Sequence, residues 1–505
     1  MSAPSVSLSA RLGLSKVSYE NPGENHLLIT LEGGKLDKSK TRKPLRVGAA
    51  IDTSGSMAGQ KLDFAIKSLC IFVDNLTADD MFGVCGFSDN VFSVVKPAFM
   101  TPENKEAAKA EIRGLRSMSA TNLSGATIEA FNLANADRPK KDKVPKAEFG
   151  KLGAAKIIDD ANDVDDGFLC RGFLFTDGQP TAGDTSKEGL IKLAGSRIGG
   201  ASLTAFGYGS DHDAELLASM ASKGGGNYYF IEDFDKCPAF FGRELGGLIS
   251  CMAQGIKIKI KAASGVKFTK VFNDLDVDAS DDQSECTISM DDVYAEEKRK
   301  ILILTELPEK SKAVAARASK LCDIEVTYVD LKTGEKVKLE DSVKIEYVKE
   351  DEADKKVDKE VEEQIVRFKG LEAQEEARRL ADRGNFAGGQ SVLRSFSAFA
   401  GNQGWQGMAD DVGEAALYLS DAGTYESGGK KGLMARSMSY GTGRGGTIET
   451  AAMFGTRVQA DTAAKFQDES KSGSADAAGG ATGGLGGRAA TGGVAGRLSK
   501  KRSRK

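Results

Sequence analysis

The 505-residue chain has little of what most hydrolases and many metal sites use. It contains only two histidines, His26 and His212, and this scarcity argues against histidine-based catalysis. Seven cysteines are scattered without a C-x-x-C pair, which excludes common zinc modules and favours a reducing compartment. There is no G-x-x-x-x-G-K-[ST] phosphate loop, so nucleotide hydrolysis is not supported. We therefore expect a non-enzymatic protein.

Long apolar runs and a strong net charge are also missing. No apolar run is long enough to span a membrane, so we expect no membrane span. Residues 1–14 lack a basic region followed by an apolar core, and we expect no secretory signal and a cytoplasmic location. The net charge of -4 indicates no dominant partner, and nucleic acid is not expected. The exception is the basic end 498–505, which fits nuclear import or a phosphate-rich partner as well as a solubilising tail.

A short apolar stretch that ends in a polar loop is the most informative feature of the chain. Val47–Ile51 is apolar without alternation, which is typical of a strand covered on both faces of a parallel sheet. Asp52, Ser54 and Ser56 follow at alternate positions, where open α/β sheets bind their ligands. Their hard oxygen donors suit a divalent cation such as Mg2+. Spacing alone also fits a turn with a serine N-cap.

Two further loops offer oxygen ligands. Thr121 stands just before a helical pattern that begins at Leu123. A second buried strand ends in Asp177, followed by Gly178. The start of the helix behind Thr121 would bring positive dipole and free N–H groups near the first loop, which favours an incoming anion.

These residues resemble the metal-ion-dependent adhesion site of von Willebrand factor A-type (VWA) domains, in the same order along the chain. The resemblance implies that Ser54, Ser56 and Thr121 bind the metal directly or in alternate states. It also implies that Asp52 and Asp177 act largely through water. The expected cofactor is Mg2+, with Mn2+ or Ca2+ as substitutes. One departure is that Met118-Ser119-Ala120 stands where glycines often precede the threonine.

The remaining patterns divide the chain into several parts. Strand-then-helix units predict a Rossmann-like α/β domain with a mostly parallel sheet, interrupted by an insertion loop at 136–167. The alternating strands after Gln254 predict an antiparallel β-sandwich, which the strands before residue 42 would complete. The α/β domain would then be inserted into the sandwich, with both ends of the insertion close in space. The predicted order is N-terminal sandwich strands 1–42, VWA domain 43–254, β-sandwich 255–350, small α-helical module 351–425, irregular segment 426–466 and disordered tail 467–505.

Three further stretches are similar to a narrower group of proteins. Residues 205–217, 226–233 and 245–250 resemble the VWA cores of plant-type RING-finger ubiquitin ligases and of VWA–Hint proteins. The chain has no zinc spacing for a RING finger and no evident Hint module. The resemblance therefore implies a binding or scaffolding core without ligase activity, and it suggests that 426–458 can fold back on earlier domains.

Two functions compete at this point. The first is a protein-binding adaptor that captures an Asp or Glu carboxylate of a partner protein through the cation. The second is a structural subunit of a larger complex or of a self-assembly, in which the metal only stabilises the three loops. Hydrolysis at the metal is disfavoured, because serine hydroxyls are poor ligands for activating water.

Overall fold

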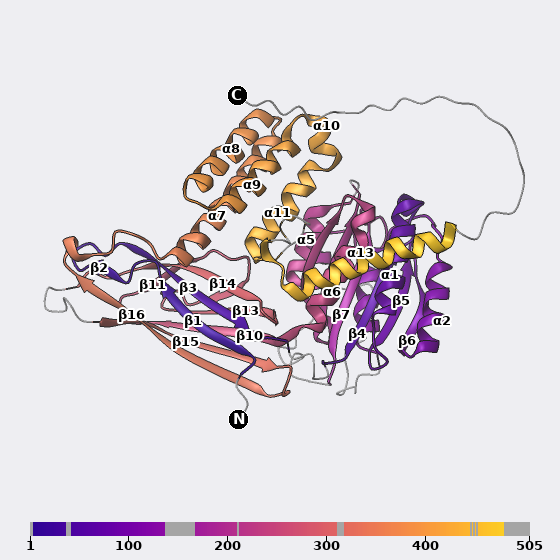
Figure 1. Cartoon of the computed structure of the whole chain (residues 1–505), viewed down its shortest axis with the longest axis horizontal. Coiled ribbons are helices and arrows are strands. Elements are labelled where there is room, and N and C mark those ends of the chain that lie inside the picture. The colour runs from indigo at the N-terminus through magenta and orange to yellow at the C-terminus, as the bar shows by residue number, and fades with distance from the viewer. Residues whose placement is uncertain are drawn as a thin grey trace, which may run out of the picture.

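The computed structural model describes residues 4–36, 42–136, 167–209, 212–310, 318–444, 447, 450 and 453–478. Within these residues the chain forms an α/β domain, a unit of two further sheets and a group of C-terminal helices (Figure 1). Most of the predicted insertion loop and the chain beyond residue 478 lie outside the described residues.

The α/β domain is built on a six-stranded sheet in the order β6-β5-β4-β7-β8-β9. Neighbouring strands are parallel, except that β6 runs antiparallel to β5 at one edge. The strands are β4 (Leu45–Asp52), β5 (Met81–Phe87), β6 (Val91–Phe99), β7 (Leu169–Thr176), β8 (Ser202–Tyr208) and β9 (Gly225–Ile231). This order places β4 beside β7, and each of these two strands leads into one of the predicted metal loops.

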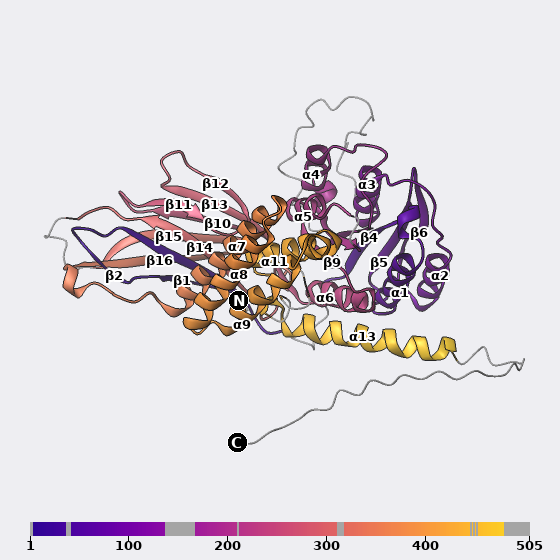
Figure 2. The ribbon, with the colours of Figure 1, turned by 90° about the horizontal axis from the view of Figure 1, so that it is seen from above.

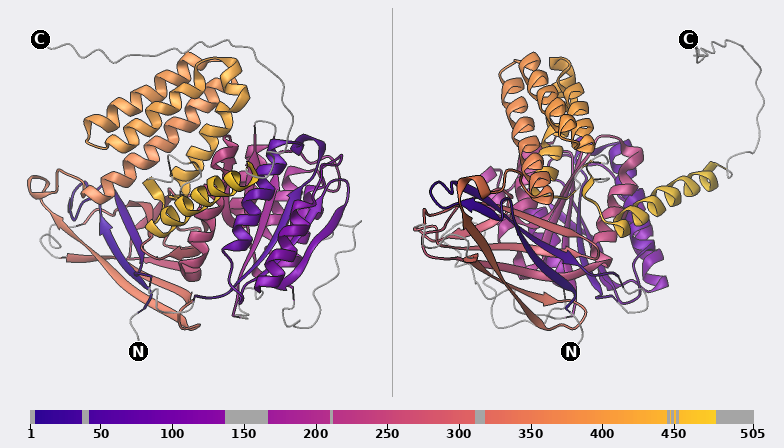
Figure 3. Two further views of the ribbon diagram at one scale, coloured as in Figure 1. Left: turned by 45° about the vertical axis from the view of Figure 1, so that its right-hand side comes forward. Right: turned by 60° about the vertical axis from the view of Figure 1, so that its left-hand side comes forward.

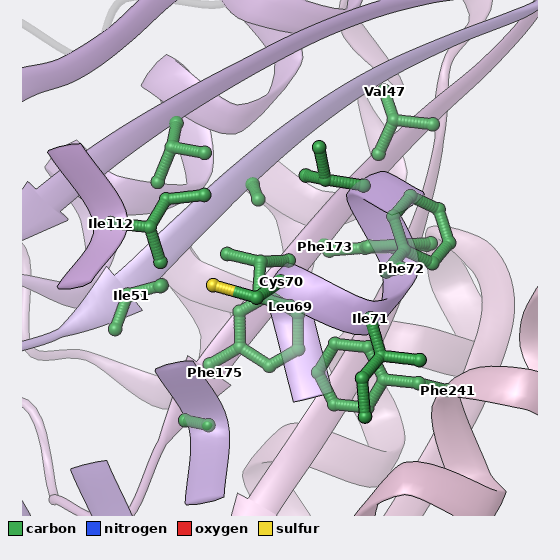
Figure 4. Packing of buried hydrophobic residues seen from close by; sticks show 14 of the residues in the cluster. Val47, Ile51, Leu69, Cys70, Ile71, Phe72, Ile112, Phe173, Phe175 and Phe241 are labelled. Atoms are coloured by element: carbon green, nitrogen blue, oxygen red, sulfur yellow. The ribbon is translucent and has the colours of Figure 1, made fainter. Parts of the chain in front are cut away.

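Helices cover both faces of this sheet (Figure 2). One face carries α1 (Gln60–Asp74), α2 (Pro102–Arg113) and α6 (Cys237–Ile249), and the other carries α3 (Leu123–Ala134), α4 (Lys187–Gly195) and α5 (Ala214–Lys223). Every residue of β4, β5, β7 and β8 is buried, as their apolar runs predict for strands covered on both sides. On the α1 side, the rings of Phe175 and Phe241 stack with centroids 5.1 Å apart (Figure 4). This packing holds β7, one of the two loop-bearing strands, against α6.

The two further sheets share one hydrophobic core. Their strand orders are β1-β3-β14-β11 and β12-β13-β10-β15-β16-β2, and all pairs are antiparallel except β16 with β2. The strands are β1 (Val6–Leu12), β2 (Lys16–Ser18), β3 (Glu24–Gly33), β10 (Cys251–Ala262), β11 (Lys267–Val271), β12 (Asp276–Ala279), β13 (Glu285–Tyr294), β14 (Lys298–Glu306), β15 (Ala318–Asp330) and β16 (Lys336–Val348). The N-terminal strands thus pair with strands that follow the α/β domain.

Both ends of the inserted domain meet at one hairpin. The amide of Gly33, at the end of β3, donates to the carbonyl of Glu297 at 3.0 Å. The amide of Ala295 donates to the carbonyl of Ser250, just before β10, at 2.8 Å. The predicted proximity of the two ends is therefore confirmed, and the α/β domain is fixed to the sheets by two chain segments instead of one flexible linker.

The C-terminal helices differ from the sequence prediction in two ways. The first helix of the module expected from residue 351 begins at Lys359, because the side chain of Asp358 caps the amides of Glu360 and Val361. The segment 426–466 was predicted to be irregular, and this is wrong. The helices of this region are α7 (Lys359–Asp382), α8 (Phe386–Asn402), α9 (Gln406–Ala415), α10 (Ala422–Thr424), α11 (Lys430–Thr442) and α13 (Arg457–Ala478).

Two of these helices reach the α/β domain. On α11, Ala435 joins the core beneath α3 and α5, while Leu433 and Tyr440 join the core of the helical module. Helix α13 lies along α6, across the α/β domain (Figure 3). It continues to Ala478, so the predicted disorder from residue 467 is wrong for its first residues. The expectation that the C-terminal segment folds back on earlier domains is confirmed.

Candidate metal centre

Asp52 stands at the carboxyl end of β4 and is fully buried. One carboxylate oxygen, Oδ1, accepts from the backbone amide of Ser54 at 2.7 Å, and Oδ2 accepts from Oγ1 of Thr176 at 2.5 Å. Thr176 is the last residue of β7, so this bond joins the ends of two adjacent parallel strands. Burial raises the pKa of the Asp52 carboxyl to about 6, and the nearby charge of Asp177 acts in the same direction.

Ser54 and Ser56 face the second carboxylate. Their hydroxyl oxygens are 3.0 Å apart, and Oγ of Ser56 donates to Oδ1 of Asp177 at 2.8 Å. Asp177 directly follows β7 and is fully buried. The structure therefore brings together Asp52, Ser54, Ser56 and Asp177, although Asp177 lies more than a hundred residues further along the chain.

Thr121 completes the group from the third loop. Its amide donates to Oγ1 of Thr181 at 2.9 Å, and the preceding loop is tied to the first one where the amide of Gly55 donates to the carbonyl of Ser119 at 3.3 Å. A Cβ atom placed on Gly178 would lie 2.8 Å from Oγ1 of Thr121 and 3.5 Å from Oδ2 of Asp52. The absence of a side chain at Gly178 thus lets Thr121 approach more closely than any residue with a Cβ atom would allow.

The structure adds a residue that the sequence prediction missed. The ammonium group of Lys61, from the first turn of α1, forms an ion pair with Oδ2 of Asp177. The side chain of Lys61 is 16% exposed, whereas that of Asp177 is fully buried. A lysine on an amphipathic helix has no sequence signal that separates it from a surface residue, so only the fold reveals it.

The start of α3 is close to the site, but its first turn is partly capped. Asn122 is the N-cap residue, and its side-chain oxygen accepts from the amide of Gly125 at 3.0 Å. Its own amide donates to the carbonyl of Ser88 at 2.8 Å. The expected help from free amides is therefore smaller than the sequence suggested, although the helix dipole still points its positive end toward Thr121.

The donor set fits a hard divalent cation. It consists of two buried carboxylates and three hydroxyls from three loops, and the two donors next to Gly178 are Thr121 and Asp52. Lys61 compensates one of the two buried negative charges, a bound cation would compensate the other, and oxygen donors suit Mg2+. Among the described residues there is no cluster of three or more His, Cys, Asp and Glu side chains, so a zinc or iron site of that kind is not found there.

Comparison with known proteins defines the class of this domain. Residues 45–147 and 155–230 match the family model of the von Willebrand factor type A domain. This match agrees with the α/β fold and with the oxygen donors at its strand ends. The chain therefore contains a VWA domain.

Two solved structures share the fold over most of the chain. A von Willebrand factor type A protein from Catenulispora acidiphila covers 85% of this chain and 97% of its own, with a TM-score of 0.66 and 14% identity. The ArnB paralog VWA2 from Sulfolobus acidocaldarius covers 86% of this chain and 99% of its own, with a TM-score of 0.54 and 14% identity. At this identity the likeness concerns the fold alone.

Curated relatives match over a smaller part. Inter-alpha-trypsin inhibitor heavy chain H4 from Bos taurus is 29% identical over 186 residues, which is 36% of this chain and 18% of that protein. Heavy chain H1 from Homo sapiens is 24% identical over 267 residues, which is 51% of this chain and 26% of that protein. The chain thus spans about a fifth to a quarter of the length of these relatives. In the part of the chain that the structure describes, no helix has the length and apolar character needed to cross a membrane.

Proposed function

We propose that this chain is a non-enzymatic binding module that holds a divalent cation, preferably Mg2+. The residues that would bind the cation are Asp52, Ser54, Ser56, Thr121 and Asp177. The partner is a protein that presents an Asp or Glu carboxylate at this site. The observation that carries the proposal is the meeting of two fully buried carboxylates and three hydroxyls from three loops that lie far apart in the sequence. When bound, the cation supplies a Lewis-acidic position that the partner carboxylate can complete.

The protein residues have separate tasks in this proposal. Asp52 and Asp177 provide the negative charge that retains a cation in a buried position. Ser54, Ser56 and Thr121 are neutral donors, so they complete the shell without cancelling the positive charge that attracts an acidic partner. The dipole of α3 adds to this attraction.

The direct test is capture of acidic peptides in the presence and absence of metal. The purified chain is applied to an array of peptides, each containing one Glu or Asp and paired with a Gln or Asn twin. We expect retention of acidic peptides in Mg2+ buffer, no retention of the amide twins, and loss of retention in EDTA. The Asp177→Ala variant should lose retention in both buffers. Equal retention with Mg2+ and EDTA would show that binding does not use the metal.

A structural role is the second candidate function. The loops are already joined by hydrogen bonds such as that from the amide of Thr181 to the carbonyl of Thr121 at 2.9 Å. A metal in this position could simply strengthen these joints in a subunit of a larger assembly. A rise in melting temperature with Mg2+, together with unchanged peptide capture, would favour this role, and light scattering would detect self-assembly.

Three other parts of the prediction remain proposals. All seven cysteines are free thiols, which supports a reducing compartment such as the cytoplasm. The similarity to the VWA cores of RING-finger ubiquitin ligases and VWA–Hint proteins remains a prediction from the three short stretches. The basic end 498–505 lies outside the described residues, so its proposed role in nuclear import is independent of the fold.

A further inference from the structure

Lys61 occupies an unusual position for a lysine. It is the second residue of α1, and its ammonium group reaches Asp177 beyond the end of β7. On its other side, a Cβ atom placed on Gly209 would lie 3.0 Å from Cε and 3.3 Å from Nζ of Lys61. The charge is therefore held between the ends of β7 and β8, where little water reaches it.

The location is electrostatically unfavourable without a specific partner. The first turn of a helix carries the positive end of the macrodipole, which favours acidic residues and disfavours lysine. Holding a flexible lysine in one geometry also costs side-chain entropy. The ion pair with Asp177 offsets both effects, and it joins Lys61 directly to a carboxylate of the candidate metal centre.

The charges at the site can be counted over the described residues that form it. Asp52 and Asp177 contribute two negative charges, and Lys61 contributes one positive charge, so these three described residues together provide a net charge of minus one. A divalent cation changes this sum to plus one, and one partner carboxylate then makes it zero. Without Lys61 the same cation would already neutralise the site, and a carboxylate would leave it negative.

We propose that Lys61 is a specificity-determining residue, because it leaves the metal-loaded site with a net charge of plus one that a partner carboxylate neutralises. The ammonium group of Lys61 competes with the cation for Asp177, so it lowers the affinity of the partner-free site for the cation. It also raises the affinity of the metal-loaded site for an anionic partner. Metal and carboxylate then bind cooperatively, and neutral donors are poorly accepted. This inference rests on the proposed metal-dependent capture and adds how the site selects an acidic partner.

The test measures Mn2+ affinity by titration calorimetry, first in chloride buffer and then with saturating acetate. Lys61→Met removes the charge, Lys61→Gln removes the charge but keeps a donor for Asp177, and Lys61→Arg keeps the charge. Lys67→Met is the matched control, since it removes the same charge from the same helix about 9 Å further along the axis.

For the original chain we expect acetate to tighten Mn2+ binding. In chloride, Lys61→Met and Lys61→Gln should bind Mn2+ at least about 10-fold more tightly than the original chain, because one unit charge has left the site. The gain from acetate should largely disappear in both. Lys61→Arg and Lys67→Met should behave like the original chain.

Two different failures can be told apart. If the original chain and Asp52→Ala bind Mn2+ equally or not at all, the proposed metal centre is wrong, and the role of Lys61 with it. If the original chain binds Mn2+ through Asp52, but folded Lys61→Met and Lys61→Gln show the same affinity and the same acetate effect, the metal centre stands and the inference about Lys61 is overturned.

Discussion

Replacement of Gly178 by alanine is a specific test of the metal centre, since it adds a single methyl group next to two candidate ligands, Thr121 and Asp52. The added Cβ would lie 2.8 Å from Oγ1 of Thr121, closer than real Cβ atoms approach their neighbours, and 3.5 Å from Oδ2 of Asp52. Gly178 is not among the glycines with positive φ, so alanine fits its backbone conformation. The perturbation is therefore steric and local.

The expected loss follows from this geometry. Thr121 has to turn its hydroxyl away from the methyl group, which removes or misplaces one oxygen donor. Disturbing the orientation of one ligand at a metal site typically weakens binding by about 10- to 100-fold, which corresponds to about 1.4–2.8 kcal/mol. The stability of the metal-free fold should change by less than about 1 kcal/mol, because the smaller entropy of the unfolded alanine variant offsets part of the strain.

Titration calorimetry with Mn2+ and thermal unfolding in EDTA give the two readouts. The control is Gly407→Ala in α9, where an added Cβ has no neighbour within 4 Å. Gly407→Ala should keep the Mn2+ affinity of the original chain, while Gly178→Ala should lose it with little change in EDTA. If folded Gly178→Ala binds Mn2+ as tightly as the original chain, the space beside Gly178 does not hold the ion.

Three further predictions concern the stability of the fold. Arg444→Met removes the nearer of two arginine partners of the buried Glu297 carboxylate, at 2.8 Å, and leaves Arg299 at 3.7 Å, so chemical denaturation should show a loss of about 3 kcal/mol. Burial lowers the pKa of His212 from 6.5 to about 3, so the unfolded chain takes up this proton first. The free energy of unfolding that neutral His212 provides above pH 6.5 is then lost as the pH falls. In denaturant titrations between pH 6 and 4, His212→Gln should reduce the slope of the unfolding free energy against pH by about 1.4 kcal/mol per pH unit. Gly246→Leu should detach α13 and make it sensitive to proteases, because a Cβ atom there lies 2.8 Å from Cα of Gln459, whereas Gly401→Leu should not.

The meeting of the candidate ligands was predictable because it depends on sheet topology. Asp52 and Asp177 each follow an apolar run without alternation, and such runs form adjacent parallel strands whose carboxyl ends share one edge. Residues more than a hundred positions apart thus arrive at one place without any signal beyond the two runs. The pairing of the N-terminal strands with later ones was predictable for a related reason, since two strands alone are not stable.

Helices α11 and α13 and the position of Lys61 were not predictable, because they depend on close contacts. Helix α13 approaches α6 where Gly242 and Gly246 have no side chains, and a Cβ on Gly242 would lie only 2.6 Å from the carbonyl of Thr462. In the sequence, two glycines in a helix only lower its propensity. Likewise, the Gly-rich stretch that contains α11 has a low intrinsic helix propensity. Its burial between two hydrophobic cores provides the free energy that stabilises the helix.

The arrangement of buried ion pairs also determines where a partner can approach. Asp292 pairs with Arg171 near the start of β7, and Asp291 contacts the start of β9, where a Cβ on Gly225 would lie 2.3 Å from it. The sheet unit is therefore attached at the amino ends of these strands. Asp177 lies six residues beyond Arg171, about 20 Å away at about 3.3 Å per residue. Because the attachment and the metal loops lie at opposite edges of one sheet, the sheet unit fixes the α/β domain without covering the edge at which an acidic side chain would bind.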